Sequence, residues 1–144
     1  MLINYLQLLL LQTLVSRSGG QNTRVLNLKI NKMKVVIKEN TWLTRGIIDF
    51  GWGNGYVLIP ENHPLHGKHY EDINVDVHGG LTFSELVDAE MVANWELDKE
   101  DEGKWCVGFD TAHYADNISK WSKEKVQEEA ERLKEQLMSY EAVS

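Results

Sequence analysis

The chain has 144 residues, of which 42% are apolar and 26% are charged, and its formal net charge is −7 at pH 7. A chain of this length and composition can bury a hydrophobic core as one globular domain. The acidic balance argues against a nucleic-acid groove or an anionic membrane surface as the partner, since both require clustered lysine and arginine side chains.

The cysteine content sets a further limit. Cys106 is the single cysteine of the sequence, which excludes an internal disulfide and a Cys-rich zinc cluster. A lone cysteine fits a cytoplasmic protein, because that compartment keeps thiols reduced. Cys106 stands in an alternating apolar run, so we expect a buried and unreactive thiol.

The first 32 residues differ in character from the rest of the chain. An apolar run at 6–15 has about the length of a signal-peptide core and is too short to span a bilayer as a helix. No Lys or Arg precedes it and the small-residue cleavage pattern is absent, so secretion is the less favoured interpretation. We predict that 1–32 is an N-terminal extension outside the core, with a helix packed on the domain as the alternative, and that 33–144 is a single domain.

From Met33 onward, short segments of β character follow one another. The segment 34–38 is a β-branched run, and 45–60 holds two apolar stretches around the Gly-Asn-Gly sequence at 53–55. An Asn-Gly pair supplies the positive φ angles of a tight turn, so the two stretches are expected to form a β-hairpin. The segment 61–72 contains Pro, Gly and three histidines, and we expect a loop with these histidines at its surface.

The next segments alternate between apolar and polar residues. Segments 73–78 and 81–86 are expected to be strands joined by a turn at the glycine pair 79–80, with Ile73, Val75 and Val77 on the buried face of the first. The acidic run 96–103 is expected to be a solvated loop. The strand at 104–110 should then direct Trp105, Val107 and Phe109 toward the core.

The C-terminal segment has a helical pattern. Its apolar residues recur at spacings of four, three and four, along one stripe of a helix from about 123 to 140: Val126, Ala130, Leu133 and Leu137. Ser122 is a good N-cap for this helix. The stripe can pack on the sheet or pair with a second copy in a homodimer. The sequence therefore predicts an α+β fold, with an antiparallel sheet of about five strands and one amphipathic C-terminal helix packed on it.

Part of the sequence resembles a known family. The string "GYVLIPENHPLHGKHYEDINVDVHGGLTF" at 55–83, followed by "GFDTAHYAD" at 108–116, is similar to small proteins of phages, prophages and their bacterial hosts. The resemblance runs from about 52 to 121, roughly half of the chain. It implies a setting rather than an activity, because small phage proteins often counter host defences.

Polar side chains gather where two of the expected strands end. If the strands at 73–78 and 104–110 are neighbours, Gly108 leaves an open space above the sheet, and the loop after it can close over that space. The expected pocket is formed by these residues: Asn74, Asp76, His78, Gly79, Gly80, Asp110, His113, Tyr114 and Asp116.

Three functions fit such a pocket. The favoured one is binding of a small, nucleotide-like ligand, with Asn and Asp on ribose hydroxyls, and with His and the glycine amides on phosphate. Trp52, Tyr56 or Tyr114 would stack on the base. The second is metal-dependent hydrolysis, in which His78, Asp110 and His113 hold a divalent ion, although their spacing is not a diagnostic metal motif. The third is a protein-interaction module, for which the sequence specifies no surface. Asp110 can instead bond its own turn, and His78 can be a turn histidine without a further role.

Overall fold

The computed structural model describes residues 32–41 and 50–140. In chain order its elements are β1 (Lys34–Glu39), β2 (Gly53–Ile59), the 3-10 turn η1 (Tyr70–Asp72), β3 (Phe83–Leu86), α3 (Ala89–Asn94), the 3-10 turn η2 (Lys99–Asp101), β4 (Trp105–Phe109) and α4 (Lys123–Ser139). The strands form one antiparallel sheet in the order β1-β2-β4-β3. The predicted α+β class is therefore confirmed, with four strands in the sheet rather than about five.

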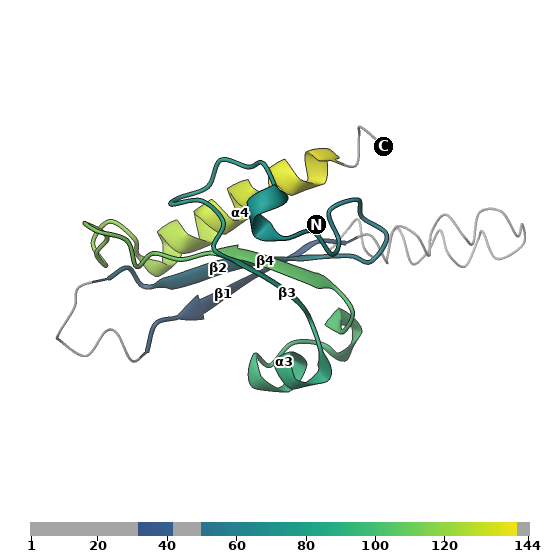
Figure 1. Cartoon of the computed structure of the whole chain (residues 1–144). Helices are drawn as coiled ribbons and strands as arrows, with labels where there is room; N and C mark the ends of the chain where they lie inside the picture. The colour runs from purple at the N-terminus through teal and green to yellow at the C-terminus, as the bar shows by residue number, and fades with distance from the viewer. Residues whose placement is uncertain (1–31, 42–49, 141–144) are drawn as a thin grey trace, which may run out of the picture. The chain divides into compact units, whose positions relative to one another are not determined.

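Helix α4 covers one face of the sheet, where it contacts β1 and β2 (Figure 1). All residues of the predicted apolar stripe are fully buried: Val126, Ala130, Leu133 and Leu137. They share a core cluster with Val107 and Phe109 of β4, which face the core as predicted. The Ser122 side chain accepts a hydrogen bond from the N–H of Lys125 and caps the helix. Because the stripe is buried within the chain itself, the structure gives no support to a homodimer formed through it.

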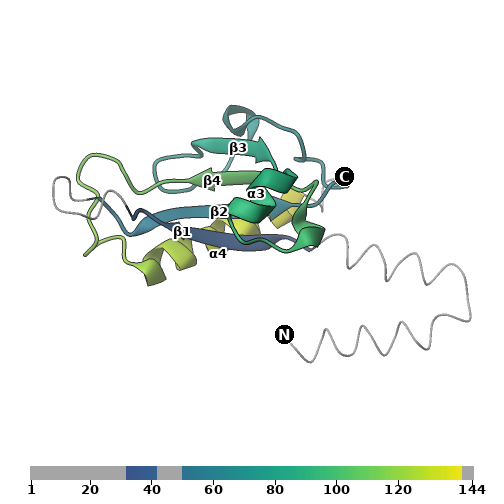
Figure 2. The ribbon, with the colours of Figure 1, turned by 90° about the horizontal axis from the view of Figure 1, so that it is seen from below.

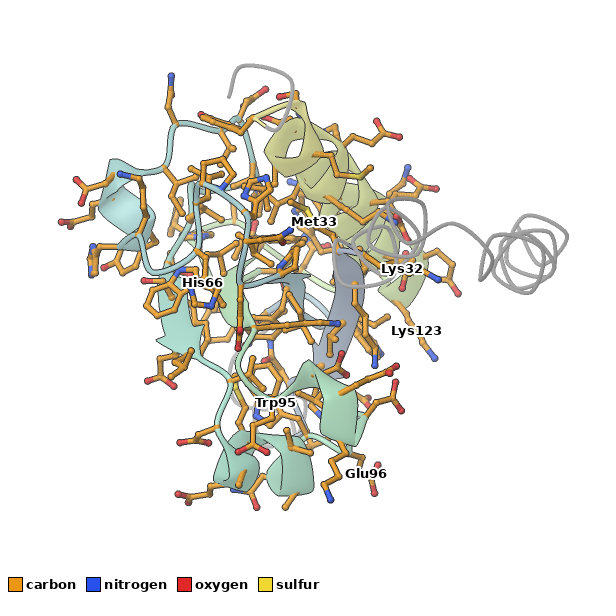
Figure 3. The ribbon with its side chains drawn as sticks, turned by 90° about the vertical axis from the view of Figure 1, so that its right-hand side faces the viewer. Lys32, Met33, His66, Trp95, Glu96 and Lys123 are labelled. Atoms are coloured by element: carbon orange, nitrogen blue, oxygen red, sulfur yellow. The ribbon has the colours of Figure 1, made fainter. Side chains whose placement is uncertain are left out.

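The opposite face of the sheet carries a smaller apolar cluster under α3 (Figure 2). This helix of six residues was not predicted, because it is too short to show an apolar period. Trp95 follows its last turn and lies toward the sheet (Figure 3), with its ring 4.6 Å from that of Tyr56. Cys106 belongs to this cluster and is fully buried, and burial raises the pKa of its thiol far above the usual range, as expected for an unreactive cysteine.

The predicted hairpin turn at 53–55 is wrong, because these residues lie inside the continuous strand β2. Strand β2 pairs with β1, with Gly55 opposite Ile37. A Cβ atom at Gly55 would lie 2.5 Å from the ring of Phe109 and 3.1 Å from Ala130. The glycine is therefore needed for close packing under α4, and the turn chemistry of Asn-Gly is not used. The first half of the predicted hairpin falls largely at 42–49, outside the described residues.

The predicted strand at 73–78 is wrong, because 73–77 belong to no strand and His78 lies in the glycine turn. Ile73 and Val77 are buried in the cluster of α4, which confirms their predicted face. The segment pairs with the helix instead of with a strand: the N–H of Asp76 donates to Gln136 Oε1 and Gln136 Nε2 donates to the Asp76 carbonyl, both at 2.8 Å. One glutamine side chain thus satisfies both backbone groups of Asp76, for which a neighbouring strand was expected.

The acidic run at 96–103 is more structured than the predicted loop, since it contains η2. The Asp101 side chain is only 1% exposed and lies 2.7 Å from both Lys34 Nζ and Lys104 Nζ. Burial alone would raise the pKa of Asp101, but the hydrogen bonds from Lys104 and Lys34 outweigh it and lower this pKa. Among the described residues, no helix is long and apolar enough to cross a membrane.

Candidate functional site

A tight turn positions the first histidine. Gly79 and Gly80 have φ angles of +67° and +78°, and the N–H of Gly80 donates to the Val77 carbonyl at 2.9 Å. The predicted turn at the glycine pair is therefore present, although it does not join two paired strands. The backbone N–H of His78 donates to Glu129 Oε2 of α4 at 3.3 Å. This contact holds the turn against the first half of the helix.

A second turn, directly after β4, positions the other side chains. Asp116 Oδ2 accepts from the N–H of His113 at 2.9 Å, and the N–H of Asp116 donates to the His113 carbonyl at 3.0 Å. Between them, Ala115 has a φ of +71°, a conformation that a residue with a side chain rarely adopts. The turn therefore brings a carboxylate back toward a histidine three residues earlier.

The two turns meet at what we call the His–Asp centre, formed by His78, His113 and Asp116. His78 Nε2 lies 2.9 Å and 3.0 Å from the two Asp116 carboxylate oxygens, and it donates because a carboxylate only accepts. The rings of His78 and His113 are edge to face, with centroids 5.4 Å apart. Each residue offers one ligand atom, and these atoms lie within 4.8 Å of one another. In the described part of the chain, this is the group of histidines and acids that is close enough to hold a metal ion.

Trp121 supports the centre from one side. Its ring lies 4.2 Å from the ring of His78, at an angle of 35°. The Trp121 carbonyl accepts from the N–H of Trp52 at 2.8 Å, which ties this support to the start of β2. Neither Trp121 nor Glu129 was a predicted site residue, because nothing in the local sequence indicates which side chain reaches His78 from a distant segment.

The absence of a side chain at Gly79 leaves room for the His113 ring. A Cβ atom at this position would lie 2.1 Å from His113 Nε2, closer than any real contact. A Cβ atom at Gly80 would meet nothing within 4 Å. Gly79 is therefore required by the imidazole behind it as well as by its backbone, whereas Gly80 is required by its backbone alone.

Three residues of the predicted pocket are not part of the centre. The Asp76 side chain is 92% exposed and lies 3.3 Å from Arg132 of α4. The Asn74 carbonyl accepts from the Tyr140 hydroxyl at the far end of the same helix. Tyr114 is fully exposed. Asn74 and Asp76 are thus not placed to share a ribose with His78.

The space expected above Gly108 is filled. A Cβ atom at this position would lie 2.3 Å from the Tyr56 ring, so the glycine serves packing under α3 rather than a pocket. The shallow hollow beside α4 is lined instead by Asn74, Gln136, Ser139 and Tyr140. No part of that hollow is lined by a residue of the His–Asp centre.

The metal ligands expected from the sequence were His78, Asp110 and His113. The centre contains both histidines, with Asp116 in the place of Asp110. Asp110 accepts from the N–H of Ala112 at 3.0 Å and from the Thr82 hydroxyl at 2.9 Å. Asp110 therefore bonds its own turn, which was the alternative interpretation. Its Oδ1 lies next to the centre, 3.3 Å from His113 Nε2.

The three loop histidines are not part of a metal group in the described residues. His63 is buried rather than on the surface: its Nε2 donates to the Leu137 carbonyl, and its Nδ1 accepts from the N–H of Leu65, both at 3.1 Å. His66 Nε2 donates to the Gly103 carbonyl at 2.8 Å. These histidines tie the loop to α4 and to the end of η2.

Comparisons of the chain with protein-family models, curated proteins and solved structures found no match. The fold and the site define an α+β domain with a candidate metal centre between a glycine turn and the loop that follows β4.

Proposed function

We propose that the protein is a metal-dependent hydrolase whose divalent ion is held by His78, His113 and Asp116. The observation that carries the proposal is the approach of two imidazoles and one carboxylate, with ligand atoms within 4.8 Å of one another. Two nitrogens and one oxygen suit zinc, and three protein ligands leave a position open for water, as in catalytic zinc sites.

The spacing of the donors supports binding of a small ion. Zinc ligands at about 2.1 Å and tetrahedral angles lie about 3.4 Å from one another. The most distant pair of ligand atoms, within 4.8 Å, would have to close by at most about 1.4 Å, and His78 Nε2 and the Asp116 oxygen, now 2.9 Å apart, would have to separate slightly. The proton that His78 Nε2 shares with Asp116 would leave on binding, because a metal ligand must be deprotonated.

The centre is also accessible to a substrate. The side chains of His78 and His113 are 24% and 35% exposed, whereas Asp116 is buried beneath them. An ion bound here would keep its open position toward solvent. It would lower the pKa of its bound water and polarise an ester or phosphoryl oxygen, so hydrolysis would need no separate nucleophilic side chain.

A second candidate is binding of a nucleotide-like ligand without chemistry. One observation favours it: Tyr114 is fully exposed next to His113 and could stack on a base. The ligand's phosphate would then take the open position of the ion. The ribose contacts originally expected from Asn74 and Asp76 are not available at the same place.

Metal titration by calorimetry tests the proposal. The purified protein, stripped with a chelator, should bind one zinc ion per chain, less tightly at acid pH because protons compete for the ligands. His78→Ala and Asp116→Asn each remove one donor and should weaken binding by more than about 100-fold. His69→Ala is the matched control, since His69 is exposed and outside the centre, and its affinity should equal that of the wild type.

Hydrolysis is measured with the same proteins. Chromogenic esters and phosphodiesters of p-nitrophenol should be turned over by the zinc-loaded wild type and not by the two ligand variants. Equal and weak zinc uptake by all four proteins would contradict the metal centre. Stoichiometric zinc binding without turnover of any probe would reject the hydrolase and favour the second candidate.

A further inference from the structure

We propose that Asp110 is a positioning residue that makes the two histidines bind the ion through different nitrogens. In this arrangement His78 coordinates through Nε2, and His113 coordinates through Nδ1. The inference rests on the proposed metal centre and adds to it which ring atom of each histidine is the ligand and which side chain decides this.

The two nitrogens of His113 have different surroundings. Nε2 is buried and has no hydrogen-bond partner, although Asp110 Oδ1 lies only 3.3 Å from it. The backbone of Gly79 encloses the same atom, since a Cβ there would be 2.1 Å away. An ion cannot enter between Nε2 and these neighbours. Nδ1 is the ring nitrogen nearer to the backbone. Because the backbone N–H of His113 donates to Asp116 Oδ2 at 2.9 Å, Nδ1 is the nitrogen on the side of the Asp116 carboxylate.

Asp110 is itself held in place. Its Oδ2 accepts from the Thr82 hydroxyl and its Oδ1 accepts from the N–H of Ala112, at 2.9 Å and 3.0 Å. A carboxylate oxygen has two acceptor sites, so Oδ1 can accept a second hydrogen bond. The carboxylate is thus fixed beside His113 Nε2 by groups that take no part in binding the ion.

These contacts define a chain from carboxylate to imidazole to metal. A proton on Nε2 directed at Asp110 leaves the lone pair of His113 on Nδ1. Metal-ligating histidines commonly donate their second N–H to a carboxylate, which fixes the tautomer and makes the ligand nitrogen more basic. The present 3.3 Å separation lacks hydrogen-bond geometry, and a small rotation of the ring as the ligands close on the ion would provide it.

His78 has the opposite arrangement. Its Nε2 faces Asp116 at 2.9 Å, and its ring is held by the stack on Trp121. The ion would replace the shared proton and bind at Nε2. One centre would therefore contain one histidine of each coordination type.

NMR of the wild-type protein labelled with ¹⁵N histidine and loaded with ¹¹³Cd tests this assignment directly. We expect direct cadmium coupling to Nε2 of His78 and to Nδ1 of His113, and a proton on His113 Nε2. Coupling to Nε2 of both histidines would overturn the inference while leaving the metal centre intact. Absence of cadmium coupling to either ring would overturn the metal centre, and this inference with it.

Zinc affinity gives a second and independent test. Asp110→Asn removes the charge behind His113 and should weaken zinc binding by about 10- to 100-fold. Asp76→Asn removes one negative charge from an exposed position that faces Arg132, and zinc affinity should change less than twofold. Circular dichroism checks that both variants are folded.

The pattern of losses separates the possibilities. Equal losses in the two variants would mean that overall charge, and not Asp110, sets the affinity, and would overturn the inference. An Asp110→Asn protein that binds zinc as tightly as the wild type would do the same. Should Asp110→Asn fail to fold, the NMR experiment on the wild type still decides.

Discussion

Leu133→Asp should abolish the cooperative unfolding transition. Leu133 is fully buried in the middle of the α4 stripe. It belongs to a core cluster that also contains side chains of the strands. The substitution removes a leucine from a packed core and places a charge there, at a cost of about 5 kcal/mol or more. Domains of this kind have a total stability of about 5–15 kcal/mol. The measurement is thermal unfolding followed by circular dichroism.

Met138→Asp is the control on the same helix. Met138 is 46% exposed, so the same new charge stays in water and the melting temperature should change by no more than a few degrees. A folded, monomeric Leu133→Asp protein with an unchanged melting temperature would show that the stripe is an interface between copies and does not pack on the sheet.

Gly79→Ala should weaken zinc binding by more than about 100-fold. The added Cβ would lie 2.1 Å from His113 Nε2, so the imidazole must move by about 1 Å or more from its place in the centre, and displacements of this size are costly at sites that depend on geometry. Alanine at a φ of +67° also adds strain of about 1–2 kcal/mol. Zinc titration and thermal unfolding measure the two effects separately.

Gly80→Ala separates the effect of the contact with the His113 imidazole from the effect of backbone strain. Gly80 has a φ of +78°, so alanine meets the same backbone strain, but its Cβ would have nothing within 4 Å. Both variants should therefore lose stability from backbone strain, Gly79→Ala more because of its contact with His113, and only Gly79→Ala should lose zinc affinity. Equal losses of affinity would show that the turn, rather than the space for His113, controls the site.

The parts of the fold that depend on local pattern could be predicted from the sequence. The stripe of α4 and its cap at Ser122 are fixed by spacings of a few residues, and the observed helix begins where the pattern indicates. The buried faces of Ile73, Val77 and Phe109 were also predicted by alternation. Each of these predictions concerns which side chains are buried, not which segment covers them.

Predictions that depended on which segments of the chain lie next to each other were less successful. The Asn-Gly pair in β2 has the chemistry of a turn, but packing of Phe109 and Ala130 against Gly55 places it inside a strand. Segment 73–78 alternates like a strand, but Gln136 of α4, and no neighbouring strand, bonds the backbone of Asp76 at its middle. Tertiary contacts outweighed the local signal in both cases.

The same distinction applies to the site. His78, His113 and Asp116 were all predicted pocket residues, because polar side chains beside turns are visible in the sequence. Asp116, rather than Asp110, completes the centre because the backbone turns back at Ala115, where φ is +71°. A positive φ at an alanine has no signature in the sequence, so the choice between the two carboxylates required the structure.

The most direct test of the central claim is a crystal structure of the wild type grown with one equivalent of zinc, with data collected at the zinc absorption edge. We predict one anomalous peak, about 2.0–2.2 Å from a ring nitrogen of His78, a ring nitrogen of His113 and a carboxylate oxygen of Asp116. A map without a peak at these three residues, or with zinc only at an exposed histidine such as His69, would contradict the account.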